Sequence, residues 1–186
     1  MKAFILSDGE FATGQYHRLS TAVKRSLADK GFEIAEKQLE PEELKYCVGC
    51  FGCWVKTPGR CVLRDAMDDI NRTAMNSDVV VYLAPLVFGQ FSANMKSALD
   101  RWIPNILPFF IVRADGSTMH PARYAKNPRI VMIAYGDGLT AEDTDLFRDI
   151  TTKHRQNGVV LAYDGDDEAL SRALTAVDLQ KAGAEL

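Results

Sequence analysis

The sequence has no excess of positive charge, no long apolar run, no internal repeat and no linker rich in proline, glycine or serine. Its 22 lysine and arginine residues stand against 25 aspartate and glutamate residues, for a formal net charge of -3. A chain without basic excess gains little from counterion release, so nucleic acid is not expected as a partner. The first apolar run, Ala3 to Leu6, is too short for a signal peptide or a membrane span, which predicts a cytoplasmic protein without a membrane partner.

The composition is that of one globular domain. Of the 186 residues, 47% are hydrophobic and 25% are charged, which is sufficient to bury a three-layer core without disulfides. Residues 1–186 are therefore expected to form a single domain. The four cysteines lie close together in the sequence, and in a reducing compartment such spacing indicates metal, cluster or thiol chemistry rather than a disulfide scaffold.

Short apolar runs alternate with longer amphipathic segments, which is typical of a parallel sheet whose strands are joined by helices. The predicted strands are Lys2–Leu6, Glu33–Gln38, Asp78–Ala84, Arg129–Tyr135 and Gly158–Tyr163. The predicted helices are Gln15–Lys30, Asp65–Asn76, Ser92–Trp102, one that Thr140 and Asp143 open with a capping box, and Asp166–Lys181. This pattern fits a flavodoxin-like α/β fold, a three-layer sandwich with a five-stranded parallel sheet of order 2-1-3-4-5 and a ligand at the carboxyl ends of the strands.

The loop Leu86–Gln90 follows the third predicted strand and leads to Ser92, a typical helix N-cap. Its apolar residues Leu86, Val87 and Phe88 can form a wall for a flat ring system, while backbone N–H groups meet the ring heteroatoms. The same composition is also compatible with an ordinary connecting loop that buries a phenylalanine.

A second motif lies in the loop 47–61, where Cys47, Cys50, Cys53 and Cys61 form a Cys-x2-Cys-x2-Cys-x7-Cys array. Three thiolates at this spacing can wrap one face of a cubane cluster, and the fourth can close it. Zinc usually takes two separated cysteine pairs. A redox-active disulfide and plain reduced thiols remain as further interpretations of the array.

Several motifs follow one another in order over about residues 44 to 135. They are CVGCFGCWVKTPGRCVLRDAMDDI, SDVVVYLAP, PLVFGQFS, MKSALDR, IPNILPFF and HPARY. Together they resemble the NAD(P)H-dependent FMN reductase and iron-sulfur flavoprotein-like branch of the flavodoxin-like superfamily. The resemblance implies FMN as the cofactor, NAD(P)H as a co-substrate and a [4Fe-4S] cluster as the group that the four cysteines can hold.

The resemblance also implies the residues of the flavin site. In such flavoproteins a Pro-aromatic-Gly loop lines the isoalloxazine ring, and a loop after the fourth strand completes the site. The matching residues are Pro85, Leu86, Val87, Phe88 and Gly89 in the first loop and Tyr135, Gly136, Asp137 and Gly138 in the second.

The first loop between strand and helix departs from the family pattern. Family members typically carry Gly-Ser-Pro-Arg followed by Gly-Asn-Thr, whereas this chain has SDGEFATGQYHR. Donors for the FMN phosphate are still expected at the helix N-terminus, from Ser7, Thr13, Gly14 and Gln15. Asp8 and Glu10 would repel a phosphate if both pointed inward, a repulsion that His17 and Arg18 can offset.

The expected function is therefore hydride transfer from NAD(P)H to FMN and on to a quinone, a free flavin or another acceptor. The cofactor carries the chemistry, so no catalytic side chain is assigned. Two alternatives are an electron carrier with FMN and a [4Fe-4S] cluster that serves a redox protein, and a binding module without cofactor. The apolar stretch from 102 to 110 predicts a homodimer or homotetramer, and Asp100 with Arg101 is expected to be a structural pair.

Overall fold

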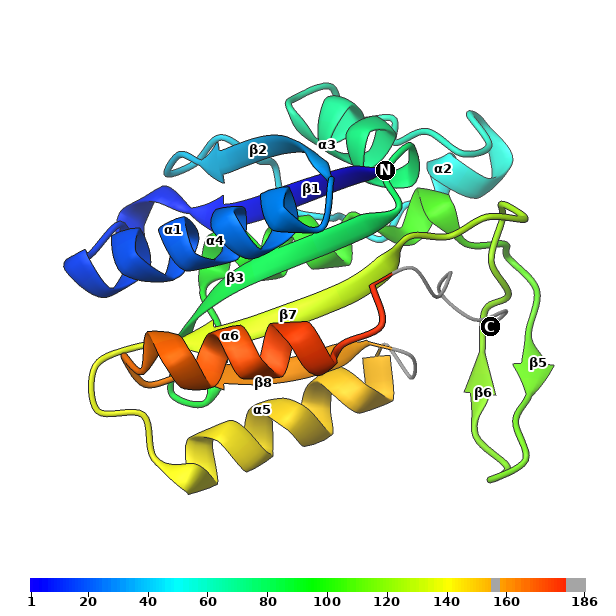
Figure 1. The fold of residues 1–186 in the computed structure, drawn as a ribbon. Coiled ribbons are helices and arrows are strands. Elements are labelled where there is room, and N and C mark those ends of the chain that lie inside the picture. The colour runs from blue at the N-terminus through cyan, green and yellow to red at the C-terminus, as the bar shows by residue number, and fades with distance from the viewer. Residues whose placement is uncertain (155–157, 180–186) are drawn as a thin grey trace.

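The computed structural model describes residues 1–154 and 158–179. Its centre is a parallel sheet of order β2-β1-β3-β7-β8, as Figure 1 shows. The strands are β1 (Lys2–Asp8), β2 (Glu33–Leu39), β3 (Val79–Val87), β7 (Arg129–Tyr135) and β8 (Val159–Tyr163). The predicted strand order 2-1-3-4-5 is confirmed.

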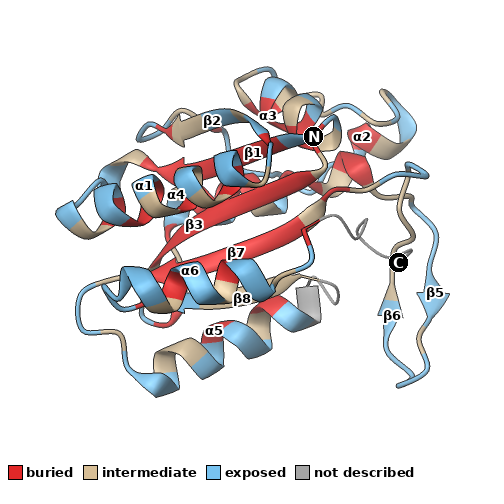
Figure 2. Ribbon diagram, in the orientation of Figure 1, coloured by how far each residue is buried: buried red, intermediate tan, exposed pale blue. Residues whose placement is uncertain are grey.

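The central strands are apolar along their length because helices cover both of their faces. Every residue from Val79 to Ala84 in β3 is buried, as is every residue from Ile130 to Tyr135 in β7. Figure 2 shows these strands as continuous buried ribbons. Strand β2 lies at the edge of the sheet, and all of its residues except the buried Leu39 are exposed or half-buried.

Helices form the two outer layers, so the predicted three-layer sandwich is also confirmed. Helices α1 (Gly14–Asp29) and α6 (Asp167–Ala176) pack into one core cluster. Helices α3 (Met67–Met75), α4 (Ala93–Asp100) and α5 (Ala141–His154) contribute to the cluster on the other face. Short helical turns occur at η1 (Gly9–Phe11), α2 (Gly52–Val55) and η2 (Ile103–Asn105). No helix of the described ranges is long and apolar enough to cross a membrane.

The helix ends follow the capping signals of the sequence. The hydroxyl of Ser92 accepts a hydrogen bond from the Met95 backbone N–H at 3.4 Å, as an N-cap residue does. At the start of α5, the Asp143 N–H donates to the Thr140 hydroxyl at 3.1 Å and the Asp143 carboxylate accepts from the Thr140 N–H at 3.1 Å, which is the predicted capping box. The predicted end of the last helix at Lys181 lies outside the described residues.

The structure differs from the prediction at several points. Strand β3 does not end at Ala84 but continues to Val87, because the chain turns back there and β4 (Gln90–Phe91) pairs antiparallel with it. The helix predicted to reach Trp102 ends at Asp100 and is followed by η2. A small antiparallel hairpin of β5 (Ile111–Val112) and β6 (Thr118–Met119), which was not predicted, stands away from the sheet in Figure 1.

Candidate functional site

The loops expected to bind the flavin meet at the carboxyl ends of the central strands. Pro85 of β3 is paired with Tyr135 of β7, which in turn is paired with Tyr163 of β8. A Cβ built on Gly136 would lie 3.7 Å from the Leu86 carbonyl oxygen, so the loop after β7 is in contact with the end of β3. The two segments named by the resemblance therefore lie side by side.

The turn between β3 and β4 consists of Phe88 and Gly89. Both residues have positive φ, of 52° and 70°, which is the conformation of a type I′ hairpin turn. Phenylalanine is a poor residue for this region, and the Phe88 side chain is 96% exposed. The backbone of Phe88 is strained and its aromatic ring is uncovered. Such a ring at this edge gives a flat ligand a surface on which to stack. Leu86 and Val87, expected in a loop, are half-buried residues at the end of β3.

Of the four residues predicted in the loop after the fourth strand, Tyr135 is the last residue of β7, and only Gly136, Asp137 and Gly138 lie in the loop. Tyr135 is buried, and its hydroxyl donates to the Phe11 carbonyl at 3.1 Å. Burial raises the pKa of Tyr135, and the charge of Asp8 raises it further, so the phenol stays neutral. Gly136 is half-buried, whereas Asp137 and Gly138 are exposed. The exposed part of this loop is therefore the part that can meet a ligand.

The predicted phosphate donors divide into two groups. The Ser7 hydroxyl is buried and lies 3.1 Å from the Tyr16 hydroxyl, so it belongs to the core. Thr13 is the exposed N-cap of α1, and apart from the adjacent residues and the backbone of α1 itself, no described atom lies within 4 Å of the position of a Cβ at Gly14. Gln15 donates to the Tyr163 carbonyl at 3.4 Å. The N-terminus of this 16-residue helix is thus open to an anion.

The two carboxylates of the first loop are engaged with helix α4. Asp8 is fully buried and accepts hydrogen bonds from the Ser92 hydroxyl at 2.5 Å and from the Asn94 amide at 2.9 Å. The same amide group donates to Glu10 at 2.9 Å. Asp8 therefore ties β1 to the start of α4, and neither carboxylate is left to face a phosphate without a partner. This cluster could not be predicted from the sequence, because its members are 84 and 86 positions apart.

All four cysteines line one small cavity of about 20 Å³. Cys47 and Cys50 are exposed on the loop, Cys53 is buried in α2, and Cys61 is half-buried. Burial raises the pKa of Cys53, and negative charge on the neighbouring thiols raises it further. The array is thus gathered in space and is not spread over the surface.

The donor set of this cavity suits a thiolate-bound cluster, because four sulfur ligands converge from one loop. Within the described residues, no group of three or more cysteine, histidine or acidic side chains is arranged so that it could hold a metal ion. A cavity of about 20 Å³ holds little more than one water molecule, so the exposed part of the loop has to open to accept a cluster. Positive φ at Gly49 and Phe51 marks the bends of that part.

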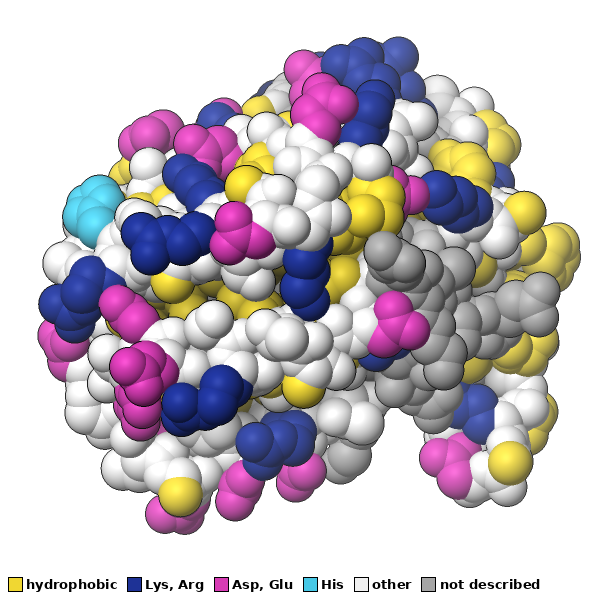
Figure 3. Space-filling view, viewed as in Figure 1, with side chains coloured by type: hydrophobic (Ala, Val, Ile, Leu, Met, Phe, Trp, Pro, Cys, Tyr) yellow, Lys and Arg dark blue, Asp and Glu magenta, His cyan; other side chains and the backbone are white. Residues whose placement is uncertain are grey.

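Only part of the apolar stretch from 102 to 110 is exposed to solvent. Trp102 and Pro104 are buried within the chain's own core, which corrects the expectation that the whole stretch faces another subunit. The exposed part is Phe109 and Phe110, followed by Ile111 and Val112 of β5. Figure 3 shows hydrophobic side chains at the right-hand edge of the molecule, and acidic and basic side chains interspersed elsewhere on that face.

An aromatic stack joins the cysteine loop to this hairpin. Phe51 stacks on Trp54 with ring centroids 5.1 Å apart, and Trp54 contacts the His120 ring at 4.8 Å. His120 in turn contacts Phe110 at 4.5 Å. Beside it, a groove of about 430 Å³ lies between the hairpin, α4 and α5.

Comparison with known proteins agrees with the motifs. The chain is 32% identical over 104 residues to an iron-sulfur flavoprotein of Archaeoglobus fulgidus, a match that covers 56% of this chain and 46% of that protein. It is 30% identical over 104 residues to an iron-sulfur flavoprotein of Methanocaldococcus jannaschii, over 56% of this chain and 53% of the relative. The chain thus spans about half the length of the curated relatives it matches. No protein-family model matches it.

Among solved structures, the chain resembles an NAD(P)H:quinone oxidoreductase from Methanothermobacter marburgensis, with a TM-score of 0.64 and 14% identity over 94% of this chain and 92% of the other. At that identity the likeness concerns the fold. The resemblance to iron-sulfur flavoproteins that the motifs indicate is confirmed by the sequence matches, and the chain has the flavodoxin-like fold.

Proposed function

We propose that the protein is an FMN-dependent oxidoreductase that takes hydride from NAD(P)H and delivers electrons to a quinone, a free flavin or another small acceptor. The observation that carries this proposal is the exposed ring of Phe88 in the β3–β4 turn, at the carboxyl edge, where the end of β3 meets the loop after β7. The names of the similar proteins, iron-sulfur flavoprotein and NAD(P)H:quinone oxidoreductase, support the same chemistry.

In this proposal the protein binds and orients the cofactor. Phe88 and its neighbours Pro85, Leu86, Val87 and Gly89 line one side of the ring, and Tyr135, Gly136, Asp137 and Gly138 border it. Thr13, Gly14 and Gln15 bind the phosphate at the N-terminus of α1, where the helix dipole favours an anion. Ser7 supports this loop from the core through Tyr16. Bound FMN supplies the hydride and electron chemistry, and no side chain is required as an acid or base.

The visible spectrum of the freshly purified protein tests this function. Flavin absorption that bleaches anaerobically on addition of NADH or NADPH and returns with a quinone is the expected result. Protein that neither carries flavin nor quenches FMN fluorescence at micromolar concentration would instead fit a binding module without cofactor. Flavin that binds but is not reduced by either nicotinamide would exclude the reductase activity while leaving the cofactor site intact.

A second candidate function is electron transfer to a redox protein through FMN and a [4Fe-4S] cluster. The observation that favours it is the single cavity lined by Cys47, Cys50, Cys53 and Cys61. Anaerobic purification should then give brown protein whose broad absorption bleaches on reduction and is lost in a Cys50→Ala variant. Purified protein without iron, before and after reconstitution, would contradict this candidate.

We also propose that the protein works as a homodimer or homotetramer in the cytoplasm. The support is the exposed apolar row Phe109–Val112, because such a row is usually covered by another subunit. Light scattering of the purified protein should give two or four times the 20.6 kDa mass of one chain. A monomer at micromolar concentration would contradict the proposal.

A further inference from the structure

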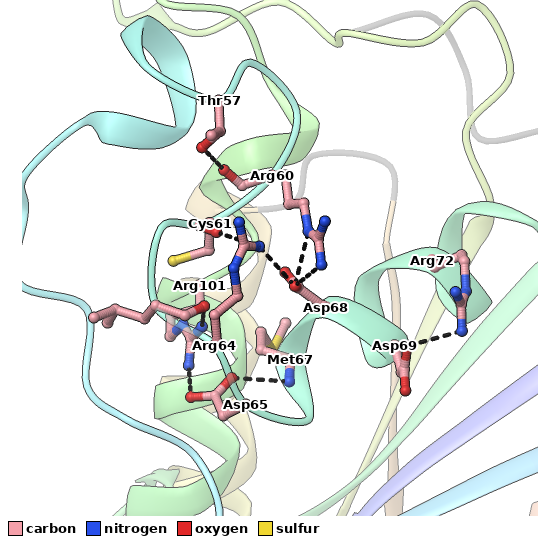
Figure 4. A network of polar contacts seen from close by, with 11 residues as sticks. Thr57, Arg60, Cys61, Arg64, Asp65, Met67, Asp68, Asp69, Arg72 and Arg101 are labelled. Atoms are coloured by element: carbon pink, nitrogen blue, oxygen red, sulfur yellow. Dashed lines mark hydrogen bonds and ion pairs between the residues drawn. The ribbon is translucent and has the colours of Figure 1, made fainter.

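A buried ion pair lies directly beneath the cysteine loop. Arg101 follows the last residue of α4, and its side chain is 1% exposed; Asp65 precedes α3, and its side chain is 7% exposed. The two groups form an ion pair, shown in Figure 4. This differs from the expected pairing of Arg101 with Asp100, since Asp100 is paired with Lys96 on the surface. A fully buried arginine needs such compensation, because an unpaired charge is very costly in the interior.

The pair holds both ends of the segment that carries the cysteines. Arg101 donates through Nη1 to the Lys45 carbonyl at 3.1 Å and through Nη2 to the Leu63 carbonyl at 3.3 Å. The Asp65 carboxylate accepts the Lys45 backbone N–H at 2.9 Å. Lys45 precedes the first cysteine and Leu63 follows the last, so one guanidinium fixes the two ends of the loop.

Arg101 also belongs to the cysteine cavity itself. Its side chain lines the same 20 Å³ cavity as the four cysteines. Its Nε, buried as well, has no hydrogen-bond partner in the described part of the chain. The wall of the cavity therefore includes a permanent guanidinium, which is paired with Asp65 and has one buried N–H group without a hydrogen-bond partner in the described residues. A guanidinium is suited to an anionic, sulfur-rich occupant.

We propose that Arg101 is the positioning residue of the cysteine centre: it fixes the loop ends and sets a positive charge against the thiolate-bound group. This inference rests on the cysteine site of the second candidate function above. When such a cluster takes up one electron from an added reductant, no covalent bond forms or breaks, and the negative charge of the centre grows by one. A nearby fixed cation stabilises the reduced form and raises the reduction potential.

The test compares variants that separate the charge from the loop contacts. Asp65→Asn keeps the side-chain oxygen that accepts the Lys45 N–H and leaves the arginine charge. The double variant Asp65→Asn/Arg101→Met removes that charge without leaving an isolated carboxylate. Arg101→Lys keeps the charge but loses the planar fork that reaches two carbonyls. Arg72→Gln is the matched control, because Arg72 forms an exposed ion pair with Asp69 in the same region.

Each variant is reconstituted anaerobically with iron and sulfide, and its midpoint potential is measured in a redox titration. The double variant should have a reduction equilibrium about tenfold less favourable than Asp65→Asn, which is about 59 mV for one electron. Arg101→Lys should keep a potential near that of the wild type but hold less iron per chain. Arg72→Gln should match the wild type in both. Equal potentials in Asp65→Asn and in the double variant would overturn the charge role.

Binding of Co²⁺ by the iron-free protein keeps this test independent of the cluster. Thiolate-bound Co²⁺ is followed by absorption, and its affinity should fall at least tenfold in the double variant and in Arg101→Lys. If the wild type takes up no iron but still binds Co²⁺ at least tenfold more tightly than these variants, the electron-carrier function is contradicted and the positioning role of Arg101 is supported. Unchanged Co²⁺ affinity in both variants would overturn that role. Thermal unfolding and FMN titration of each variant show that the domain is folded.

Discussion

Phe88→Asn is the substitution that best separates the stability of the β3–β4 turn from its proposed role. A residue with a Cβ pays about 1–2 kcal/mol in the left-handed region, and asparagine tolerates that region better than phenylalanine. Asn-Gly is also the preferred pair for a type I′ turn. Since Phe88 is 96% exposed, removing its ring loses almost no packing contacts in the free protein.

The variant should therefore be more stable than the wild type and bind FMN more weakly. A gain of about 1 kcal/mol would raise the melting temperature by about 2–4 °C in a domain of this size. Loss of a stacking surface should cost about 1.4–2 kcal/mol of binding free energy, or about 10- to 30-fold in the dissociation constant.

Differential scanning fluorimetry of the flavin-free protein and quenching of FMN fluorescence measure the two effects. Tyr46→Asn is the matched control, because Tyr46 is also exposed, at 71%, but has no positive φ and lies outside both the proposed flavin loops and the apolar row Phe109–Val112. It should change neither the melting temperature by more than a degree or so nor the FMN affinity. An unchanged FMN affinity in Phe88→Asn would refute the flavin contact, and a lower melting temperature would refute the analysis of the turn.

Three further substitutions probe the supports of the site. Ser92→Ala removes the cap of α4 and one donor to buried Asp8, so it should lower the free energy of unfolding by about 2–4 kcal/mol in a urea titration. A loss below about 0.5 kcal/mol would contradict the stabilising role of the hydrogen bonds that link β1 to α4. Gly89→Ala places a Cβ at a φ of 70° and should cost about 1–2 kcal/mol with weaker FMN binding, whereas neutral behaviour in both assays would be inconsistent with the turn geometry. Burial raises the pKa of Asp65, but hydrogen bonds, first from Arg101, lower it more, so its net pKa is below the ordinary value. This group therefore stabilises the fold above about pH 3.9 and loses that contribution as the pH falls through the folded pKa, and Asp65→Asn should flatten the acid limb of a stability profile measured between pH 6 and pH 2.

The sheet and its helices could be predicted because their signals are local. The apolar runs at 79–84 and 130–135 require cover on both faces, and the residues Thr13, Ser92 and Thr140 mark helix starts by their own chemistry. These features depend on neighbours within a few positions, which a single sequence contains.

The features that sequence analysis missed depend on distant partners or on a broken local rule. Arg101 pairs with Asp65, 36 positions away, whereas its neighbour Asp100 is nearer in sequence but points to the surface. The turn at Phe88 was hidden because phenylalanine is not a residue that predicts a left-handed conformation. Departures of this kind are expected at functional sites, where ligand binding outweighs local preference.

Hydrogen-deuterium exchange of the protein with and without saturating FMN tests the central claim most directly. We expect slower exchange of backbone amides at the start of α1, in the β3–β4 turn and in the loop after β7, with little change in the cysteine loop. Binding of FMN with unchanged exchange in all three segments, or with protection centred elsewhere, would contradict a flavin site at the carboxyl edge of the sheet.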